Sequence, residues 1–369
     1  MTAPDMTLLH HILSRIAQNG PMTLAEYMGE CLLHPTLGYY STRDPFGAGG
    51  DFTTAPEISQ MYGEMLGLSL AQAWLDQGAP ARFTLAELGP GRGTLMVDIL
   101  RATRNVPGFG AAAELHLVEA SQTLRALQRE KMPQTTFHDS TETLPDAPLF
   151  LVANEFFDAL PIRQFVRRGD GWCERLIGAD GDALTFGLGP QGAQTALSHR
   201  LNDTNDGDLV ETCPAAAPIA HRIGGLIQQH GGAALIVDYG DWHSLGDTLQ
   251  ALSQHKTADP LARPGMADLT AHVDFEPLAQ ATPGAHSLLC PQGVFLERLG
   301  ITARAQALAS KMQGDMLNAH IAAHRRLTHP QEMGTLFKVL GLFPQGAMPP
   351  PGLEPAPVPN ATEPDKARP

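Results

Sequence analysis

The feature that most constrains the fold of this 369-residue chain is a glycine-rich turn near residue 90. The turn lies in Leu85-Ala86-Glu87-Leu88-Gly89-Pro90-Gly91-Arg92-Gly93-Thr94, after a short apolar run. Glycine at alternate positions lets the backbone turn sharply and approach a ligand without a Cβ in the way. The N–H groups that open the next helix can bind an anionic group. The pattern predicts a ligand-binding strand–turn–helix unit, although a plain β–α connection remains the alternative for the turn alone.

Four short apolar segments, separated by helical stretches, predict the central strands. They lie at residues 83–88, 115–118, 149–152 and 234–237. Nearly continuous hydrophobicity over so few residues is typical of parallel strands that helices cover on both faces. The chain is therefore predicted to form an α/β fold around a Rossmann-like sheet.

The remaining segments are predicted to flank this sheet. Residues 1–82 read as an N-terminal helical segment, and the sheet domain extends over 83–343 with an insertion at about 168–230, where turn signals indicate a β-hairpin. The sequence predicts one long helix over residues 302–327. From 344 to 369 the chain is rich in proline and poor in large apolar residues, which predicts a disordered tail.

Charge and composition limit the partners of the chain. Its formal net charge of −14 disfavours nucleic-acid backbones and anionic membranes, so a basic protein segment is the more natural partner. No apolar stretch approaches the ~20 residues of a membrane span, and the N-terminus resembles neither a signal nor a transit peptide. The cysteines form no Cys-x-x-Cys pair, so neither a zinc site nor a disulfide framework is indicated. A cytoplasmic protein that binds no metal is expected.

Acidic residues at the ends of two predicted strands narrow the chemical class of the expected ligand. Glu87 precedes the first glycine of the turn, where a carboxylate can meet the cationic α-amino or sulfonium end of a ligand and would repel a pyrophosphate. The spacing Gly89-x-Gly91-x-Gly93 also differs from the G-x-G-x-x-G of nicotinamide-binding folds. Glu119 ends the next strand, where it can accept hydrogen bonds from both ribose hydroxyls. Asp139 and Ser140, after a short third strand, are placed to contact an adenine amino group.

Further motifs follow one another in a specific order along the chain. They are Gly38-Tyr39-Tyr40, Gly50-Asp51-Phe52-Thr53-Thr54-Ala55-Pro56-Glu57-Ile58-Ser59, Ala153-Asn154-Glu155-Phe156-Phe157-Asp158-Ala159-Leu160-Pro161, Asp238-Tyr239-Gly240 and Asp268-Leu269-Thr270-Ala271-His272-Val273-Asp274-Phe275. With these motifs and the glycine turn, the chain closely resembles the MidA-like class I methyltransferases, from about residue 18 to 342. This family includes the mitochondrial arginine methyltransferase that assists complex I assembly.

The resemblance implies a seven-stranded, mostly parallel sheet and S-adenosyl-L-methionine as cofactor. It also implies methylation of a protein arginine in the 49-kDa-type subunit of NADH:ubiquinone oxidoreductase, in support of complex I assembly. The lack of a transit peptide favours a bacterial member. Methylation of a small molecule and a non-catalytic assembly role on the same fold are the alternatives. The intact Glu87, glycines and Glu119 disfavour a vestigial cofactor site.

The cofactor is expected to lie along the glycine turn and the ends of neighbouring strands. Asp51, Thr54 and Glu57 are expected to close over it from the N-terminal side, although Glu57 in a first helical turn is also explained by the helix dipole. The expected cofactor-binding residues are Thr54, Glu57, Glu87, Gly89, Gly91, Gly93, Thr94, Glu119, Asp139, Ser140 and Asn154.

The acceptor is expected beside the segment that follows the fourth strand, because ligands of such sheets bind at the carboxyl ends of the strands. Glu155 and Asp158 are the candidates for gripping a guanidinium, since carboxylates accept paired N–H bonds, and Phe156 or Phe157 would exclude water. The alternative is that Asp158 caps a helix and the two rings are core. His272 is a candidate proton acceptor, with a structural role as its alternative.

Overall fold

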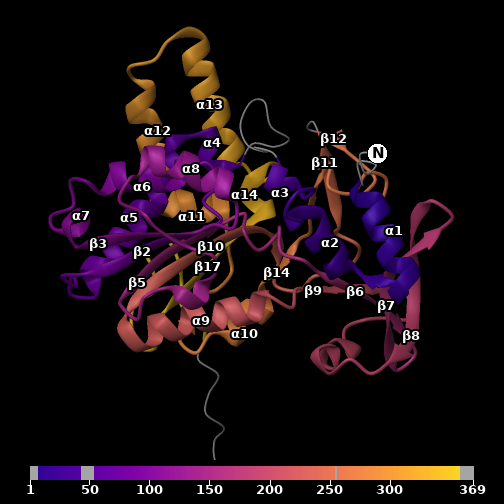
Figure 1. Cartoon of the computed structure of the whole chain (residues 1–369). Coiled ribbons are helices and arrows are strands. Elements are labelled where there is room, and N and C mark those ends of the chain that lie inside the picture. The colour runs from indigo at the N-terminus through magenta and orange to yellow at the C-terminus, as the bar shows by residue number, and fades with distance from the viewer. Residues whose placement is uncertain (1–6, 43–53, 254–255, 358–369) are drawn as a thin grey trace, which may run out of the picture.

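The structure is a computed structural model that describes residues 7–42, 54–253 and 256–357. At its centre lies a sheet in the order β15-β17-β10-β5-β2-β3-β4 (Figure 1). Its parallel strands are β2 (Phe83–Leu88), β3 (Ala113–Val118), β4 (Thr136–His138), β5 (Leu149–Asn154) and β10 (Gly232–Asp241). All of β2 and β5 is buried, so continuously apolar segments form the middle of the sheet, as predicted.

Strands after β10 complete the edge of this sheet. β17 (Phe337–Phe343) runs antiparallel to β10, and β15 (Ala285–His286) and β16 (Cys290–Pro291) pair antiparallel with β17. β14 (Val273–Asp274) pairs in parallel with the end of β10. The sheet is thus mostly parallel with an antiparallel edge, as the resemblance implies.

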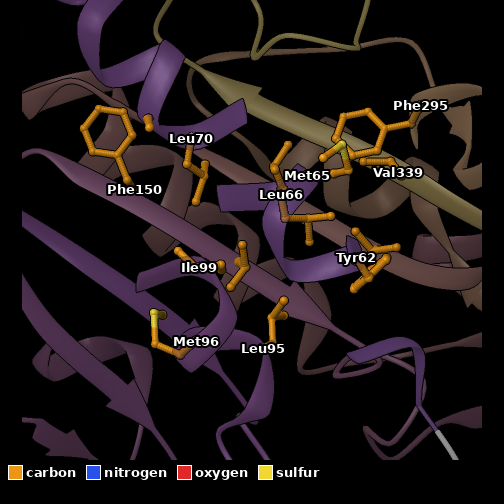
Figure 2. Packing of buried hydrophobic residues seen from close by; sticks show 14 of the residues in the cluster. Tyr62, Met65, Leu66, Leu70, Leu95, Met96, Ile99, Phe150, Phe295 and Val339 are labelled. Atoms are coloured by element: carbon orange, nitrogen blue, oxygen red, sulfur yellow. The ribbon is translucent and has the colours of Figure 1, made fainter. Parts of the chain in front are cut away.

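Two layers of helices cover the central sheet. On one face α5 (Gln60–Asp76) and α6 (Thr94–Thr103) pack in a cluster that includes Tyr62, Leu66 and Phe150 (Figure 2). α7 (Phe109–Ala112), α11 (Gln292–Arg298) and α12 (Ile301–Ala309) contribute to the same cluster. On the other face α9 (Ala216–His230) and α10 (Phe275–Ala281) cover Leu149, Leu151 and Ile236. α8 (Gln122–Lys131) connects β3 to β4, before the short helix η1 (Thr141–Thr143).

A second, antiparallel sheet corrects the predicted boundaries of the insertion. It contains β6 (Arg163–Arg168), β7 (Gly171–Asp180), β8 (Ala183–Gly192) and β9 (Leu209–Thr212), with η2 (Thr195–Leu197) and η3 (His199–Leu201) between the last two. The insertion therefore begins before residue 168, and α9, which lies within its predicted bounds, packs on the central sheet instead. Periodicity alone cannot separate these cases, because α9 is amphipathic in either place.

The N-terminal segment also divides between the two sheets. β1 (Met22–Thr23) pairs with β7, and α1 (Leu8–Asn19) and α2 (Leu24–Leu33) pack with buried Ile162 and Ile177 of the inserted region. α3 (Tyr39–Thr42) and α4 (Ala55–Ile58) follow, and α4 packs with α5 in the cluster on the central sheet. The described parts of residues 1–82, predicted as one helical segment, therefore pack against both sheets.

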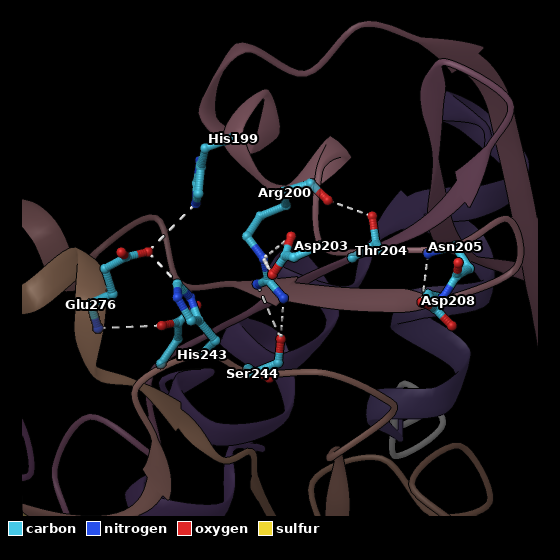
Figure 3. Close-up of polar contacts among 10 residues, drawn as sticks. His199, Arg200, Asp203, Thr204, Asn205, Asp208, His243, Ser244 and Glu276 are labelled. Atoms are coloured by element: carbon cyan, nitrogen blue, oxygen red, sulfur yellow. Dashed lines mark hydrogen bonds and ion pairs between the residues drawn. The ribbon is translucent and has the colours of Figure 1, made fainter.

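Buried polar contacts fasten the inserted sheet to the body of the protein (Figure 3). Both terminal nitrogens of Arg200, on η3, donate to the backbone carbonyl of Ser244 at 3.1 Å, and Arg200 is 2% exposed. Its Nε donates to Asp203 at 2.9 Å. The carboxylate of Glu276 on α10 lies 3.6 Å from His199 and 3.3 Å from His243. These contacts thus hold the insertion against the part of the chain that follows the central strand β10.

The C-terminal region differs from the sequence predictions in two places. The predicted long helix is a hairpin of α12 and α13 (Gly314–Thr328), which projects from the body in Figure 1, and α14 (Met333–Leu336) follows it. α12 ends at Ala309, and α13 begins at Gly314, whose φ of 57° lies outside the helical region. Residues 344–357, predicted as disordered, are ordered because Leu353 is buried and the Leu288 N–H donates to the Glu354 carbonyl at 2.8 Å. The remainder of the predicted tail lies outside the described residues.

The short strands β11 (Gln250–Ser253), β12 (Lys256–Thr257) and β13 (Asp268–Thr270) form a third sheet beside the carboxyl ends of the central strands. No helix in the described ranges is both long and apolar enough to cross a bilayer. The cysteines, all within the described residues, are unpaired thiols.

Candidate functional site

The glycine turn occupies the carboxyl end of β2, as the sequence predicts. Gly89, Gly91 and Gly93 have φ values of 59°, 52° and 74°, a region that favours glycine. A Cβ on Gly89 would lie 2.9 Å from the ring of Phe156, and one on Gly93 would lie 2.8 Å from Met132. Gly93 is the N-cap of α6 and supplies no capping side chain, so the first N–H groups of that helix remain for a ligand.

Glu87 brings a buried carboxylate to this turn. Its side chain is 3% exposed, and its Oε2 atom has no hydrogen-bond partner among the described residues. Burial raises the pKa of Glu87 to about 8, with a smaller contribution from the charge of Glu119. Glu87 lines a cavity of 260 Å³, so this carboxylate is suited to a cation bound there.

Thr54 and Glu57 reach the same cavity from the N-terminal side. Both line it, and the Thr94 hydroxyl at the start of α6 donates to Glu57 Oε1 at 2.6 Å. Thr54 is the N-cap of α4 but makes no capping hydrogen bond through its side chain. The two residues therefore lie where the sequence places them, whereas Asp51 lies outside the described residues.

A second cavity of 410 Å³ adjoins the first and contains three further cofactor candidates. Both cavities are lined by Tyr40, Gly89, Gly91, Glu155 and Ala159, so they meet beside the glycine turn. Glu119, Asp139 and Ser140 line the second one. The two cavities are therefore neighbouring parts of one site, with Glu87 in the first and Glu119 in the second.

The ends of β3 and β4 hold these residues in place. Glu119 accepts from the Ser121 N–H at 2.8 Å and from Gln128 Nε2 at 3.3 Å, and burial raises its pKa. Arg125 donates to the carbonyls of Glu119 and His138 at 2.6 and 2.8 Å and to the Asp139 carboxylate at 2.5 Å. Asp139 is largely exposed at the rim.

Asn154 and Glu155 lie at the carboxyl end of β5. Glu155 has a φ of 50°, which is unusual for a residue other than glycine. Its Oε1 accepts from the Ala55 N–H at 3.1 Å and from Asn154 Nδ2 at 3.2 Å, and the Tyr62 hydroxyl donates to Asn154 Oδ1. Burial, and then the charge of Asp158, raises the pKa of Glu155 to about 8. Both residues line the first cavity.

Asp158 and His272 complete the predicted catalytic group. Asp158 is 6% exposed, lines the first cavity and has an Oδ1 atom with no hydrogen-bond partner among the described residues. Burial raises the pKa of Asp158 to about 6. His272 also lines the cavity, its ring packs against Tyr239, and burial lowers its pKa, which favours the neutral imidazole. Phe157 is core, whereas Phe156 lines the second cavity.

Asp238 is a site residue to which sequence reasoning gave no role. Its Oδ2 accepts from the N–H groups of Phe156, Phe157 and Asp158 at 3.2, 3.0 and 3.3 Å. Burial raises its pKa well above the ordinary aspartate value. The carboxylate at the end of β10 thus shapes the loop that carries Glu155 and Asp158. Its place at a strand end, within the Asp238-Tyr239-Gly240 motif, was the available signal.

Tyr40 and Asp268 belong to two of the sequence motifs, and the sequence alone predicts no role for either. The Tyr40 hydroxyl donates to Asp268 Oδ1 at 2.8 Å, and both residues line the first cavity. Among the described residues lining that cavity, Arg92 is the only arginine or lysine, against the five acids Glu57, Glu87, Glu155, Asp158 and Asp268. The cavity therefore favours cationic ligands.

The structure brings three potential metal ligands together near the N-terminus. Potential ligand atoms of His11, Glu30 and His34 lie within 4.8 Å of one another. However, His34 Nδ1 accepts from the Thr36 and Leu37 N–H groups at 3.3 and 3.2 Å, so the proton is on Nε2. Arg15 also pairs with Glu30 at 2.9 Å. These contacts disfavour a metal ion at this cluster.

Comparisons with known proteins agree with this geometry. A family model described as S-adenosyl-L-methionine-dependent methyltransferase matches residues 65–292. The chain is 36% identical to protein arginine methyltransferase NDUFAF7 of Xenopus tropicalis, over 92% of this chain and 86% of that one. It is 35% identical to the human protein of that name, over 92% and 84%. A Burkholderia thailandensis protein crystallised with S-adenosyl-homocysteine superposes with a TM-score of 0.78 at 28% identity, over 92% and 94% of the chains.

Proposed function

Because the chain belongs to the MidA-like family of S-adenosyl-L-methionine-dependent methyltransferases, we propose that it methylates an arginine side chain of a protein. The observation that carries the proposal is the pair of carboxylates that line the first cavity, the half-buried Glu155, which also lines the second cavity, and the buried Asp158. A guanidinium can pair with two carboxylate oxygens at once, so such a pair suits arginine better than a neutral acceptor. The relatives named protein arginine methyltransferases support the same acceptor.

The residues present fit S-adenosyl-L-methionine. The Glu87 carboxylate, whose Oε2 has no partner among the described residues, would bind the α-amino group. The N–H groups of the glycine turn and of the N-terminus of α6 would bind the carboxylate of the methionine part. Glu119 would accept hydrogen bonds from the ribose hydroxyls, and Asp139 and Ser140 would lie beside the adenine. Thr54, Glu57, Thr94 and Asn154 would enclose the remainder. When bound, this cofactor supplies an electrophilic methyl group on a sulfonium.

The protein's own task is then to place and desolvate the acceptor. Glu155 and Asp158 would orient the guanidinium, and Asp238 keeps their loop in place through the backbone of residues 156–158. Holding both reactants in line supplies much of the rate enhancement in a displacement of this kind. Phe156, whose ring lies beside Gly89 and lines the second cavity, would shield the acceptor from water.

We further propose that the acceptor is an arginine of the 49-kDa-type subunit of NADH:ubiquinone oxidoreductase, as the resemblance implies, and that the enzyme acts in the cytoplasm. The test is mass spectrometry of that subunit from a deletion strain and from its parent. An arginine methylated only in the parent would support the proposal. An unmodified arginine in both strains would favour a small-molecule acceptor or a non-catalytic role.

Glu155→Gln tests the carboxylate pair with purified protein. We expect methyl transfer to fall by at least about 100-fold, because the acceptor loses a charged partner, while cofactor affinity stays within about two-fold. Glu130→Gln, at an exposed position on α8, is the matched control. Transfer to the recombinant subunit and calorimetric titration with S-adenosyl-L-methionine measure the two quantities. A Glu155→Gln protein with normal turnover would remove Glu155 from the catalytic group.

A further inference from the structure

Helix α8 and the residue before it turn one face toward the end of β3. Ser121, Arg125 and Gln128 follow one another at helical spacing, so they lie on the same side. The Ser121 N–H donates to Glu119 Oε1 at 2.8 Å, and Arg125 Nε donates to the Glu119 carbonyl at 2.6 Å. Gln128 is 0% exposed, so its amide must find its partners inside the protein.

The amide of Gln128 joins two parts of the site. Its Nε2 donates to the Gly91 carbonyl at 2.6 Å and to Glu119 Oε2 at 3.3 Å. A primary amide nitrogen carries two N–H groups, so both are in use. Oε1 is buried without a partner among the described residues, and turning the amide over would place it against two acceptors. The nitrogen therefore ties the glycine turn to Glu119 in this one orientation.

These contacts leave Glu119 with a defined set of free acceptor positions. Each carboxylate oxygen can accept two hydrogen bonds, and the protein supplies one to Oε1 from Ser121 and one to Oε2 from Gln128. One position on each oxygen remains, which matches the two neighbouring hydroxyls of a ribose. Burial raises the pKa of Glu119, and the bonds from Ser121 and Gln128 oppose this change, so they favour the charged acceptor.

We infer that Gln128 is a positioning residue that fixes Glu119 against the glycine turn, so that this carboxylate receives both ribose hydroxyls while the turn holds the methionine part. The inference rests on the proposed placement of S-adenosyl-L-methionine and is independent of the methyl acceptor. Gln128 lines neither cavity, so it acts through Glu119 and Gly91. Its loss should weaken recognition of the ribose more than binding of the rest of the cofactor.

The test compares S-adenosyl-homocysteine with its 2′,3′-dideoxy analogue by isothermal titration calorimetry. The ratio of the two dissociation constants measures the hydroxyl preference. In the wild type we expect a preference of at least about 100-fold, because hydrogen bonds to a charged acceptor are strong. Gln128→Met, which is similar in length but has no N–H group, should weaken binding of S-adenosyl-homocysteine about ten-fold and of the analogue less than about three-fold. Gln122→Met, at an exposed position on α8, should change neither constant.

A double-mutant cycle shows whether Gln128 acts through Glu119. Glu119→Ala should remove most of the hydroxyl preference, and Gln128→Met added to it should lower the preference no further. Equal weakening of both ligands in Gln128→Met would show a packing role only and would overturn the inference. A further loss of preference in the double variant would overturn it as well.

A shorter amide provides a second variant if Gln128→Met does not fold. Gln128→Asn withdraws the nitrogen by one methylene and should also lower the hydroxyl preference, whereas a preference kept in this variant would contradict the inference. A wild type without any hydroxyl preference would overturn both the inference and the placement of the ribose at Glu119. Arginine methylation of the 49-kDa-type subunit is measured separately, so a failure there leaves this result unaffected.

Discussion

At Gly91 the backbone has a φ of 52°, and this residue lies in the turn that lines the proposed cofactor site. Gly91 lines both cavities, so a side chain there would enter the site as well as strain the turn. Space is also limited at Gly89, because a Cβ there would lie 2.9 Å from the ring of Phe156. Residue-level changes in the turn should therefore affect ligand binding more than folding.

Gly91→Val should weaken S-adenosyl-L-methionine binding by roughly 100-fold, which corresponds to about 2.7 kcal/mol. Isothermal calorimetry measures this directly. Gly110→Ala is the control, because a Cβ at Gly110 meets nothing within 4 Å. If the valine variant were folded and bound the cofactor with wild-type affinity, the turn would not be the binding site.

At the scale of elements, the inserted antiparallel sheet depends on a few buried polar contacts with the body. Arg200 is almost completely buried between η3 and the turn at Ser244, where it satisfies a backbone carbonyl. Removing a partner of a buried polar group costs more than removing an exposed ion pair. The junction between the two sheets should therefore be sensitive to this one side chain.

Arg200→Ala should lower the free energy of unfolding by about 1–3 kcal/mol, because the Ser244 carbonyl loses its donors. Urea denaturation followed by circular dichroism gives this value. Arg325→Ala removes an exposed pair with Glu332 and should change it by less than about 1 kcal/mol. Equal losses in both variants would mean that the contacts of Arg200 do not fasten the insertion.

At the scale of the whole molecule, the acids of the site make the free protein less stable as the pH rises. Burial raises the pKa of Glu87 and Glu155 from 4.5 to about 8, so the folded state holds their protons more tightly than the unfolded state. The stability from this difference is complete below pH 4.5 and is lost as the pH rises through 8. Burial lowers the pKa of His116, His138 and His272 from 6.5, which affects stability only below that value.

The melting temperature of the ligand-free protein should therefore fall by several degrees between pH 6.5 and 8.5. Differential scanning calorimetry across this range is the measurement. Glu87→Gln should make the decline shallower, because one of the two acids no longer titrates, and Glu130→Gln should not. A melting temperature that stays level, or rises, over this interval would contradict the assignment of these buried acids.

The sequence by itself determined the local units: the turn after 83–88, the apolar parallel strands and the acids at their ends, because these depend on neighbours close along the chain. Only the tertiary structure decided which distant side chains meet. Asp238 reaches residues 156–158 because β10 pairs with β5, and Tyr40 reaches Asp268 across 228 residues. It also decided that α9 covers the central sheet and that 344–357 is ordered. Such contacts depend on strand order and packing, which leave no fixed spacing in the sequence.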